Sequence, residues 1–254
     1  MSFLLKFILS GAILFLVLVA GLALFQQFLI FPRVMVGPAP ALPAQTERLT
    51  LTVGSDTLHG VRIPGRDPSQ PTILGFPGNG TNSETIALFL HQVAPAQDVV
   101  VYHYRGYPPS TGTPSANAVL ADALAIHDSL QGPVTAIGFS IGSGVAAHLA
   151  SARKLDRVIL VTPFDSLAQV AADTLPFLPV RWLIRHDMTA ATDLANTTAP
   201  VTLVLATQDE VIAPARSEAL ASTLPQAQVV RLAAGHNDIY NHPEFVPTLR
   251  HALR

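Results

Sequence analysis

A glycine–serine–glycine motif, residues 138–142, places the strongest limit on how this chain can fold. The apolar run at 134–137 comes directly before it, and the small residues at 143–147 come directly after it. This order predicts a buried strand, a sharp turn and a helix. The turn holds its central residue in a strained backbone conformation, and only small flanking residues leave room for it. The sequence therefore predicts that the hydroxyl of Ser140 stands exposed at the carboxyl end of a strand.

Short apolar runs alternate with helix-like segments along the rest of the chain, which is typical of a parallel sheet with helices on both faces. Alternation of polar and apolar residues at 48–53 and 57–63 predicts an antiparallel hairpin ahead of it. We therefore expect an α/β fold with a mostly parallel sheet. Further strands are expected at 72–76, 98–104, 156–161, 201–206 and 228–232, and helices at 82–92 (with Ser83 as its candidate N-cap), 116–130, 214–224 and 243–253.

The segment 164–200 departs from this regular alternation. Prolines and scattered apolar residues interrupt it, which favours a small cap over the carboxyl edge of the sheet. An ordinary crossover helix with extra turns is the alternative interpretation.

Two residues after later strands are suited to activate Ser140. A serine hydroxyl becomes a good nucleophile when a base removes its proton, and histidine is suited to that task. His236 comes directly after the last expected strand, and Asp209 comes directly after the strand before it. Because the carboxyl ends of parallel strands meet at one edge, we expect these three residues to converge, in the chain order serine, acid, histidine.

Other residues compete for the two partner roles. His242 precedes a proline and fits the start of a helix, and His103 lies within an expected buried strand. Glu210 is adjacent to Asp209 and is expected to point away from it. Asp165 follows the strand after the serine motif, so it stays an alternative acid.

The negative charge that develops during acyl transfer needs two N–H donors. We expect one to be the backbone N–H of Ile141, at the start of a helix. We expect the other donor in the loop 76–80. Pro77 has no N–H, so we expect the backbone N–H of Asn79 to be this second donor. A simple turn is the alternative interpretation of this Pro-Gly-Asn-Gly sequence.

The N-terminal segment is almost wholly apolar from residue 3 to residue 31, with Lys6 as its only charge. A helix needs about 20 such residues to cross the hydrocarbon core of a membrane. We therefore expect residues 1–31 to form a single membrane anchor, residues 32–47 a linker, and residues 48–254 the globular domain.

A cleaved signal peptide, with its cleavage site at 20–23, is the alternative for this segment. The apolar run is longer than a typical signal core, which favours the anchor. Lys6 and the amino terminus lie on one side of the expected span, and Arg33 and Arg48 lie on the other, so the difference in basic residues is small. We expect the N-terminus inside and the globular domain outside.

Composition excludes several classes of function. The chain of 254 residues has no cysteine, which excludes disulfides, thiolate catalysis and cysteine-bound zinc. Its net charge is −2 and it has no basic tract, so a nucleic-acid partner is not expected. A phosphate-binding loop, a dinucleotide glycine pattern and a zinc-spaced histidine pair are all missing from the sequence, so no cofactor or metal is expected.

From about Phe28 onward, the chain resembles the α/β-hydrolase superfamily. Within it, the chain is similar to the Bem46 type, which is related to the ABHD12, ABHD13 and ABHD17 hydrolases. The matching segments are Phe28-Leu29-Ile30-Phe31-Pro32, Phe76-Pro77-Gly78-Asn79-Gly80, Tyr104-Arg105-Gly106-Tyr107, Ser110-Thr111-Gly112-Thr113-Pro114, the serine motif at 138–142, 209–214 and Gly235-His236-Asn237-Asp238.

The resemblance implies a serine hydrolase that cleaves carboxylic ester or thioester bonds of an acyl substrate, which in some members is a lipid or an acylated protein. Two prolines depart from the family pattern. Pro77 stands where the family often has histidine, and Pro108 replaces a glycine after Tyr107. Two other functions stay open: a serine peptidase of the same fold, and a non-catalytic binding module tethered to a membrane.

Overall fold

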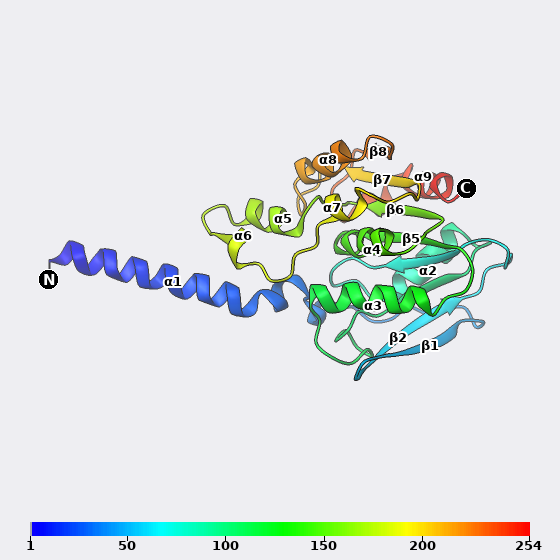
Figure 1. The fold of residues 1–254 in the computed structure, drawn as a ribbon, viewed down its shortest axis with the longest axis horizontal. Coiled ribbons are helices and arrows are strands. Elements are labelled where there is room, and N and C mark those ends of the chain that lie inside the picture. The colour runs from blue at the N-terminus through cyan, green and yellow to red at the C-terminus, as the bar shows by residue number, and fades with distance from the viewer. Residues whose placement is uncertain (1) are drawn as a thin grey trace.

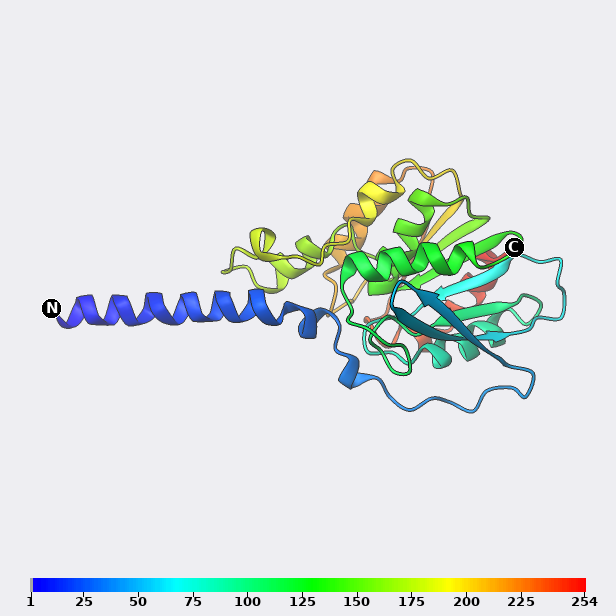
Figure 2. The ribbon, with the colours of Figure 1, turned by 60° about the horizontal axis from the view of Figure 1, so that its bottom comes forward.

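The computed structural model describes residues 2–254, except for the side chain of Trp182. It consists of a long N-terminal helix and an α/β domain, joined by a short 3-10 turn and an extended segment (Figure 1). The helix, α1 (Phe3–Ile30), projects from one end of the domain, and the C-terminus lies at the opposite end (Figure 2). Met1, the first residue of the expected anchor, lies outside the described residues.

One sheet of eight strands forms the centre of the domain, in the order β1-β2-β4-β3-β5-β6-β7-β8. β1 and β2 form an antiparallel hairpin, β2 is antiparallel to β4, and the other neighbours are parallel. This confirms the expected fold class. The strands are β1 (Glu47–Val53), β2 (Asp56–Ile63), β3 (Thr72–Phe76), β4 (Val99–Tyr102), β5 (Val134–Phe139), β6 (Arg157–Val161), β7 (Val201–Ala206) and β8 (Gln228–Leu232).

Helices cover both faces of this sheet. On one face pack α3 (Ala116–Asp128), α4 (Ile141–Ala152), α7 (Ala190–Leu194) and α8 (Pro214–Thr223). On the other face pack α2 (Ser83–Val93), η2 (Ile239–Asn241) and α9 (Phe245–Ala252). Because β5 lies between these layers, all of its residues are buried, and its carboxyl end is held rigidly.

The start of α2 differs from the sequence prediction by one residue. Asn82, not Ser83, is the N-cap, and its Oδ1 accepts the N–H of Glu84 at 2.9 Å. The amide of Asn82 also donates to the carbonyl of Gly37 at 3.0 Å, which ties the segment after α1 to the domain. Ser83 has a suitable side chain too, but the residue with the extended backbone takes the cap.

The segment 164–200 is divided between two places in the fold. α5 (Leu167–Thr174) and α6 (Val180–Leu183) extend from the domain beside the end of α1 (Figure 1). α7 instead packs on α4 within the helix layer, as a crossover helix would.

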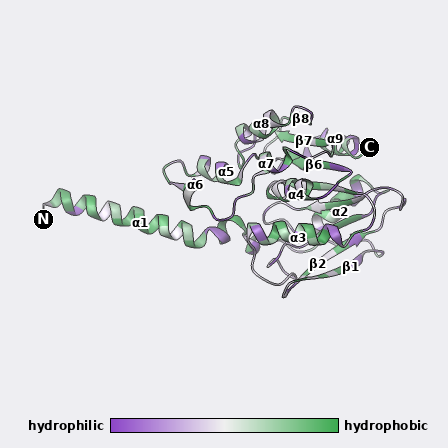
Figure 3. Ribbon diagram, viewed as in Figure 1, coloured by the Kyte–Doolittle hydropathy of each residue, from purple (hydrophilic) through white to green (hydrophobic). Residues whose placement is uncertain are grey.

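α1 has 28 residues and is apolar along its whole length apart from Lys6 and a few polar side chains (Figure 3). None of its residues is buried. At about 1.5 Å per residue it is about 42 Å long. Among the described residues, it is the one helix that is long and apolar enough to cross a membrane.

Candidate active site

The serine motif forms a sharp turn between β5 and α4. Ser140 has φ 51° and ψ −119°, a left-handed backbone conformation that is rare for a residue with a side chain. Gly138 and Gly142 must be glycines, because there is no room for a side chain at either position. A Cβ on Gly138 would lie 2.2 Å from the carbonyl oxygen of Gly142, and a Cβ on Gly142 would lie 2.2 Å from that of Phe76. These close approaches fix the position from which the Ser140 side chain projects.

Ser140, His236 and Asp209 meet at the carboxyl edge of the sheet. The hydroxyl of Ser140 lies 2.9 Å from Nε2 of His236, and Nδ1 of His236 lies 2.7 Å from Oδ2 of Asp209. Asp209 and His236 are buried, and Ser140 is half-buried. The geometry allows a proton to pass from the Ser140 hydroxyl to Nε2 while Asp209 holds the other ring nitrogen.

Two further contacts fix the partners of Ser140. The second oxygen of Asp209 accepts the N–H groups of Val211 and Ile212 at 2.9 Å and 2.7 Å. Glu210 accepts the N–H of His236 at 3.0 Å. Glu210 therefore supports the histidine loop, a role that the sequence analysis did not find. The only indication of this role in the sequence was that Glu210 is adjacent to the candidate acid Asp209.

The competing residues have other partners. Asp165 pairs with Arg216 at 3.2 Å. His242 accepts the N–H of Glu244, two residues further on, at 3.2 Å. His103 is buried beside Glu84, with 3.7 Å between Nε2 and Oε1. None of these contacts involves Ser140.

The loop expected to hold the oxyanion lies against the serine turn. A Cβ on Gly78 would lie 3.6 Å from Cβ of Ser140, and Asn79 and Ser140 line the same cleft. Two phenols hold this loop. Tyr104 donates to the carbonyl of Pro77 at 2.8 Å, and Tyr107 donates to Oδ1 of Asn79 at 3.2 Å. The sequence analysis noted both tyrosines only as part of a family signature.

Burial keeps these two phenols protonated. It raises the pKa of Tyr104 well above its usual value, and it also raises the pKa of Tyr107. Both side chains therefore act as hydrogen-bond donors across the physiological pH range. Tyr104 thereby holds the backbone of the loop at Pro77, and Tyr107 holds the side chain of Asn79.

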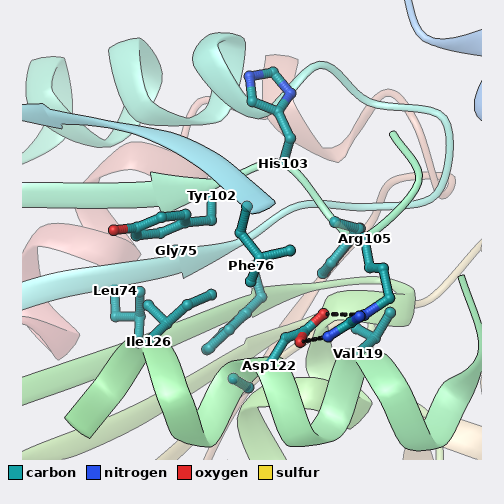
Figure 4. A pocket seen from close by; sticks show the side chains of 12 residues that line it. Leu74, Gly75, Phe76, Tyr102, His103, Arg105, Val119, Asp122 and Ile126 are labelled. Carbon is teal, nitrogen blue, oxygen red and sulfur yellow. Dashed lines mark hydrogen bonds and ion pairs between the residues drawn. The ribbon is translucent and has the colours of Figure 1, made fainter. Parts of the chain in front are cut away.

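Arg105, between the two tyrosines, anchors their loop to the domain. Its Nε donates to Asp122 of α3 at 3.0 Å, and a second nitrogen also bonds to Asp122 (Figure 4). The third nitrogen bonds to Asp56 of β2. Burial raises the pKa of Asp122, and the hydrogen bond from Arg105 opposes this shift. The cavity beside this cluster has a volume of only about 10 Å³, so Arg105 serves the structure and has no room for a substrate.

A cleft of about 570 Å³ opens in front of Ser140 and His236. Its walls are formed by apolar side chains from four segments, with polar groups between them. No Asp, Glu, Lys or Arg is among its described lining residues. The apolar lining residues are Met35, Ile86, Phe89, Val211 and Tyr240. Such a lining suits an uncharged, largely apolar group.

No group of three or more metal-ligating side chains occurs in the part of the chain that the structure describes. The side chains that contact Ser140 through His236 are arranged for proton transfer.

Comparison with solved structures identifies the fold. The Pyrococcus furiosus esterase Pf2001 superposes with a TM-score of 0.68 at 16% identity, over 86% of this chain and 98% of the esterase. The enol-lactonase of Burkholderia xenovorans superposes with a TM-score of 0.65 at 18% identity, over 81% of this chain and 99% of the lactonase. No family model matches the chain.

Sequence comparison gives relatives that match most of this chain. The Mycobacterium tuberculosis protein Rv2307c is 30% identical over 84% of this chain and 80% of its own length. The α/β-hydrolase domain-containing protein WAV2 of Arabidopsis thaliana is 28% identical over 88% of this chain and 86% of its own. The bovine lysophosphatidylserine lipase ABHD12 is 35% identical over 41% of this chain and 29% of its own. The expected resemblance is confirmed: this chain belongs to the α/β-hydrolase family, in the group of ABHD-like proteins.

Proposed function

We propose that this protein is a membrane-anchored serine hydrolase that cleaves the ester or thioester bond of an acyl substrate. The observation that carries the proposal is the hydrogen-bonded chain from Ser140 through His236 to Asp209, at the base of an open cleft. Esterase and lactonase neighbours with this fold, and the name of the ABHD12 relative, support ester chemistry.

In the proposed mechanism, the oxygen of Ser140 attacks the acyl carbonyl carbon while Nε2 of His236 takes its proton. The carbonyl oxygen becomes negative and is held by the N–H groups of Ile141 and Asn79. The tetrahedral intermediate then breaks its bond to the alcohol or thiol, which leaves with the proton from His236. Asp209 stabilises the imidazolium in between.

Water completes the reaction. His236 takes a proton from the water as its oxygen attacks the acyl-enzyme, and the second tetrahedral intermediate forms at the same N–H groups. Its collapse releases the carboxylic acid and returns the proton to Ser140. The cycle needs no cofactor, because each proton that His236 accepts is returned within it.

An amphiphilic lipid ester is the proposed substrate class. The cleft walls are apolar and lack charged side chains among the described residues, so a neutral acyl chain can be desolvated there. Met35, which lies five residues after the end of α1, forms part of the wall. The cleft is therefore within reach of a membrane that α1 enters.

The cellular location is proposed from the same helix. α1 would hold the protein in a membrane as a single span. We propose the orientation with the N-terminus inside and the catalytic domain outside; Lys6 and the amino terminus lie on one side of the span, and Arg33 and Arg48 lie on the other. A reporter fused after Arg254 tests this orientation.

Labelling with a fluorophosphonate probe tests the catalytic proposal. The wild-type protein in detergent should be labelled, and Ser140→Ala should not be. Ser143→Ala is the matched control, because Ser143 lies one turn away and its buried hydroxyl has no hydrogen-bond partner among the described residues. Equal labelling of wild type and Ser140→Ala would remove Ser140 from the mechanism.

A second assay tests the bond and the acyl group. Esters and thioesters of increasing chain length, together with a lysophospholipid and a peptide substrate, are compared by kcat/KM. We expect kcat/KM to rise with chain length and the peptide to be inert. A preference for the peptide would support the peptidase alternative.

A further inference from the structure

The structure points to a second part of this protein that enters the membrane beside α1. We propose that residues 174–186, here called the cap tip, insert their apolar side chains into the same leaflet that the end of α1 enters. The cap tip runs from the last residue of α5 through α6, and both views place it alongside the last turns of α1 (Figures 1 and 2). The inference rests on the proposed membrane anchor.

A pair of hydrogen bonds joins the cap tip to α1. The side-chain amide of Gln26 donates to the carbonyl of Leu183 at 3.2 Å, and its oxygen accepts the N–H of Arg185 at 2.7 Å. Both partners are backbone groups of the cap tip. These two bonds hold residues 183–185 beside Gln26, at the same height along the axis of α1.

One face of α1 is shielded from solvent over more than the turn that holds Gln26. Val19, Leu22, Gln26 and Ile30 lie three or four residues apart on one helix face, and all four are half-buried. Every described residue of the chain before Val19 is exposed. The contact with the domain therefore extends over the last 12 residues of α1, which is about 18 Å.

Helix length then decides where the cap tip lies. A span of about 20 residues crosses the hydrocarbon core. If the core begins at Phe3, it ends near Leu22, and the covered face already starts before that point, at Val19. If it begins at Phe7, beyond the charge of Lys6, it ends near Gln26, and the cap tip lies deeper still. Because the cap tip is bonded at the level of Gln26, which lies four residues beyond Leu22, both placements put it within about 6 Å of the hydrocarbon core, and tilting α1 would bring it closer.

The composition of the cap tip suits this depth. It contains no Asp or Glu, and its side chain at Phe177 is 92% exposed to water in the isolated protein. Moving such a side chain from water into an apolar environment is favourable. The hydrocarbon beside α1 is the partner that the geometry supplies.

Charge supports a lipid surface as that partner. Most arginines of the domain pair with carboxylates, as Arg62 does with Asp98. Arg33, Arg181 and Arg185 are exposed near the end of α1, and no described carboxylate lies within ion-pair distance of them. Cations at this level are positioned to bind lipid phosphates. Apolar side chains flanked by arginines are the pattern of a segment that lies in the membrane interface.

Because the chain has no cysteine, single-cysteine labelling can measure the depth directly. Phe177→Cys, Leu18→Cys and Ser69→Cys are each made in the full-length chain and labelled with an environment-sensitive fluorophore. They are reconstituted at one protein per nanodisc in phosphatidylcholine with phosphatidylglycerol. Leu18 is an exposed residue of α1, and Ser69 is an exposed residue of the loop before β3, at the end of the domain opposite α1 (Figure 2).

We expect the Phe177→Cys label to behave like the Leu18→Cys label, with strong quenching by spin-labelled lipid and at least threefold weaker quenching by aqueous iodide than the Ser69→Cys label. If the Leu18→Cys label reports lipid and the Phe177→Cys label reports water, the inference is wrong and the anchor stands. If the Leu18→Cys label reports water, the anchor itself fails. Protection of Phe177→Cys from iodide without lipid quenching would mean that protein covers it, which also overturns the inference.

The arginines give an independent readout. Adding Arg181→Gln and Arg185→Gln to Phe177→Cys should raise iodide quenching about twofold in discs that contain phosphatidylglycerol. In discs of phosphatidylcholine alone the same changes should have a smaller effect. Equal quenching with and without the arginines in both lipids would contradict their proposed role at the headgroups.

Discussion

At the scale of single residues, the loop opposite Ser140 depends on two hydroxyl groups that never touch the nucleophile. Tyr104 and Tyr107 bond the carbonyl of Pro77 and the side chain of Asn79. N–H donors stabilise a developing oxyanion only when they already point at it, so groups that fix the loop contribute to the reaction without contacting the substrate.

Replacing Tyr107 by phenylalanine should therefore lower kcat more than it changes KM. The hydrogen bond to Asn79 is lost, the loop gains freedom, and a net loss of about 1 kcal/mol corresponds to about a fivefold reduction in kcat. Steady-state kinetics on a soluble ester measure it.

Tyr102→Phe is the control for this change, because Tyr102 is buried nearby in β4 and its hydroxyl has no hydrogen bond to a described residue. It should retain wild-type kcat. A rise in KM alone for Tyr107→Phe would show that Tyr107 contacts the substrate, not the loop.

A buried histidine makes stability depend on pH. Burial lowers the pKa of His103 below its ordinary value of 6.5, although Glu84 opposes this shift, and Arg48 and His59 add to it. The unfolded chain then binds a proton at a higher pH than the folded chain does. Above pH 6.5 His103 is neutral in both states and does not change the free energy of unfolding. As the pH falls from 6.5 towards the folded-state pKa, the unfolded chain binds the proton first, and the free energy of unfolding decreases.

His103→Gln should consequently reduce the loss of stability on acidification. The free energy of unfolding, measured with denaturant from about pH 7 to about pH 5, should fall less steeply in the variant than in the wild type. A steeper fall in the variant would mean that the folded protein favours the charged imidazole.

At the scale of elements, the serine turn is limited by how closely α4 approaches β3. A Cβ on Gly142 would lie 2.2 Å from the carbonyl oxygen of Phe76, which is backbone and cannot rotate away. Gly142→Ala should destabilise the protein by about 1–3 kcal/mol and lower the unfolding midpoint by about 3–10 °C. Thermal unfolding followed by circular dichroism measures the change.

Gly37→Ala is the matched control, because a Cβ there meets no atom within 4 Å. Its unfolding midpoint should stay close to that of the wild type. If Gly142→Ala were equally stable, the approach of α4 to β3 would have to be wider than the structure gives.

The elements also explain which parts of the site could be predicted from the sequence. Ser140, Asp209 and His236 each follow a strand, and parallel strands bring such positions to one edge, so local pattern was enough to place them together. The supports of the site were not predictable in this way. The contact of Tyr107 with Asn79 joins loops 28 residues apart, and it depends on side-chain reach, not on the period of the sequence.

The same limit applies to α2 and to the cap. Asn82 and Ser83 are both good N-caps by composition, and only the path of the preceding chain selects Asn82. Apolar residues in the segment 164–200 indicated packing but not the partner. In the structure α7 packs on α4, and the end of α6 is bonded to α1 at a separation of 157 residues, through Gln26 and Leu183.

At the scale of the whole molecule, one side chain of α1 provides the hydrogen bonds that join this helix to the cap tip. Gln26 binds both Leu183 and Arg185 of the cap tip. Its neighbour Gln27 is also half-buried, but its side chain makes no hydrogen bond to a described residue. The two adjacent amides therefore form a natural pair of test and control.

Gln26→Leu should free the cap tip from α1 while leaving α1 as apolar as before. The N–H of Arg185 loses its acceptor at 2.7 Å, and a net loss of about 1 kcal/mol makes its local opening about fivefold more frequent. Hydrogen exchange of the peptide that contains Arg185, measured by mass spectrometry in nanodiscs, should accelerate by about that factor. Gln27→Leu should leave the exchange unchanged. If the two variants exchange equally, the bond from Gln26 does not hold the cap tip, and the depth of the cap tip in the membrane must be set by its own apolar side chains and arginines.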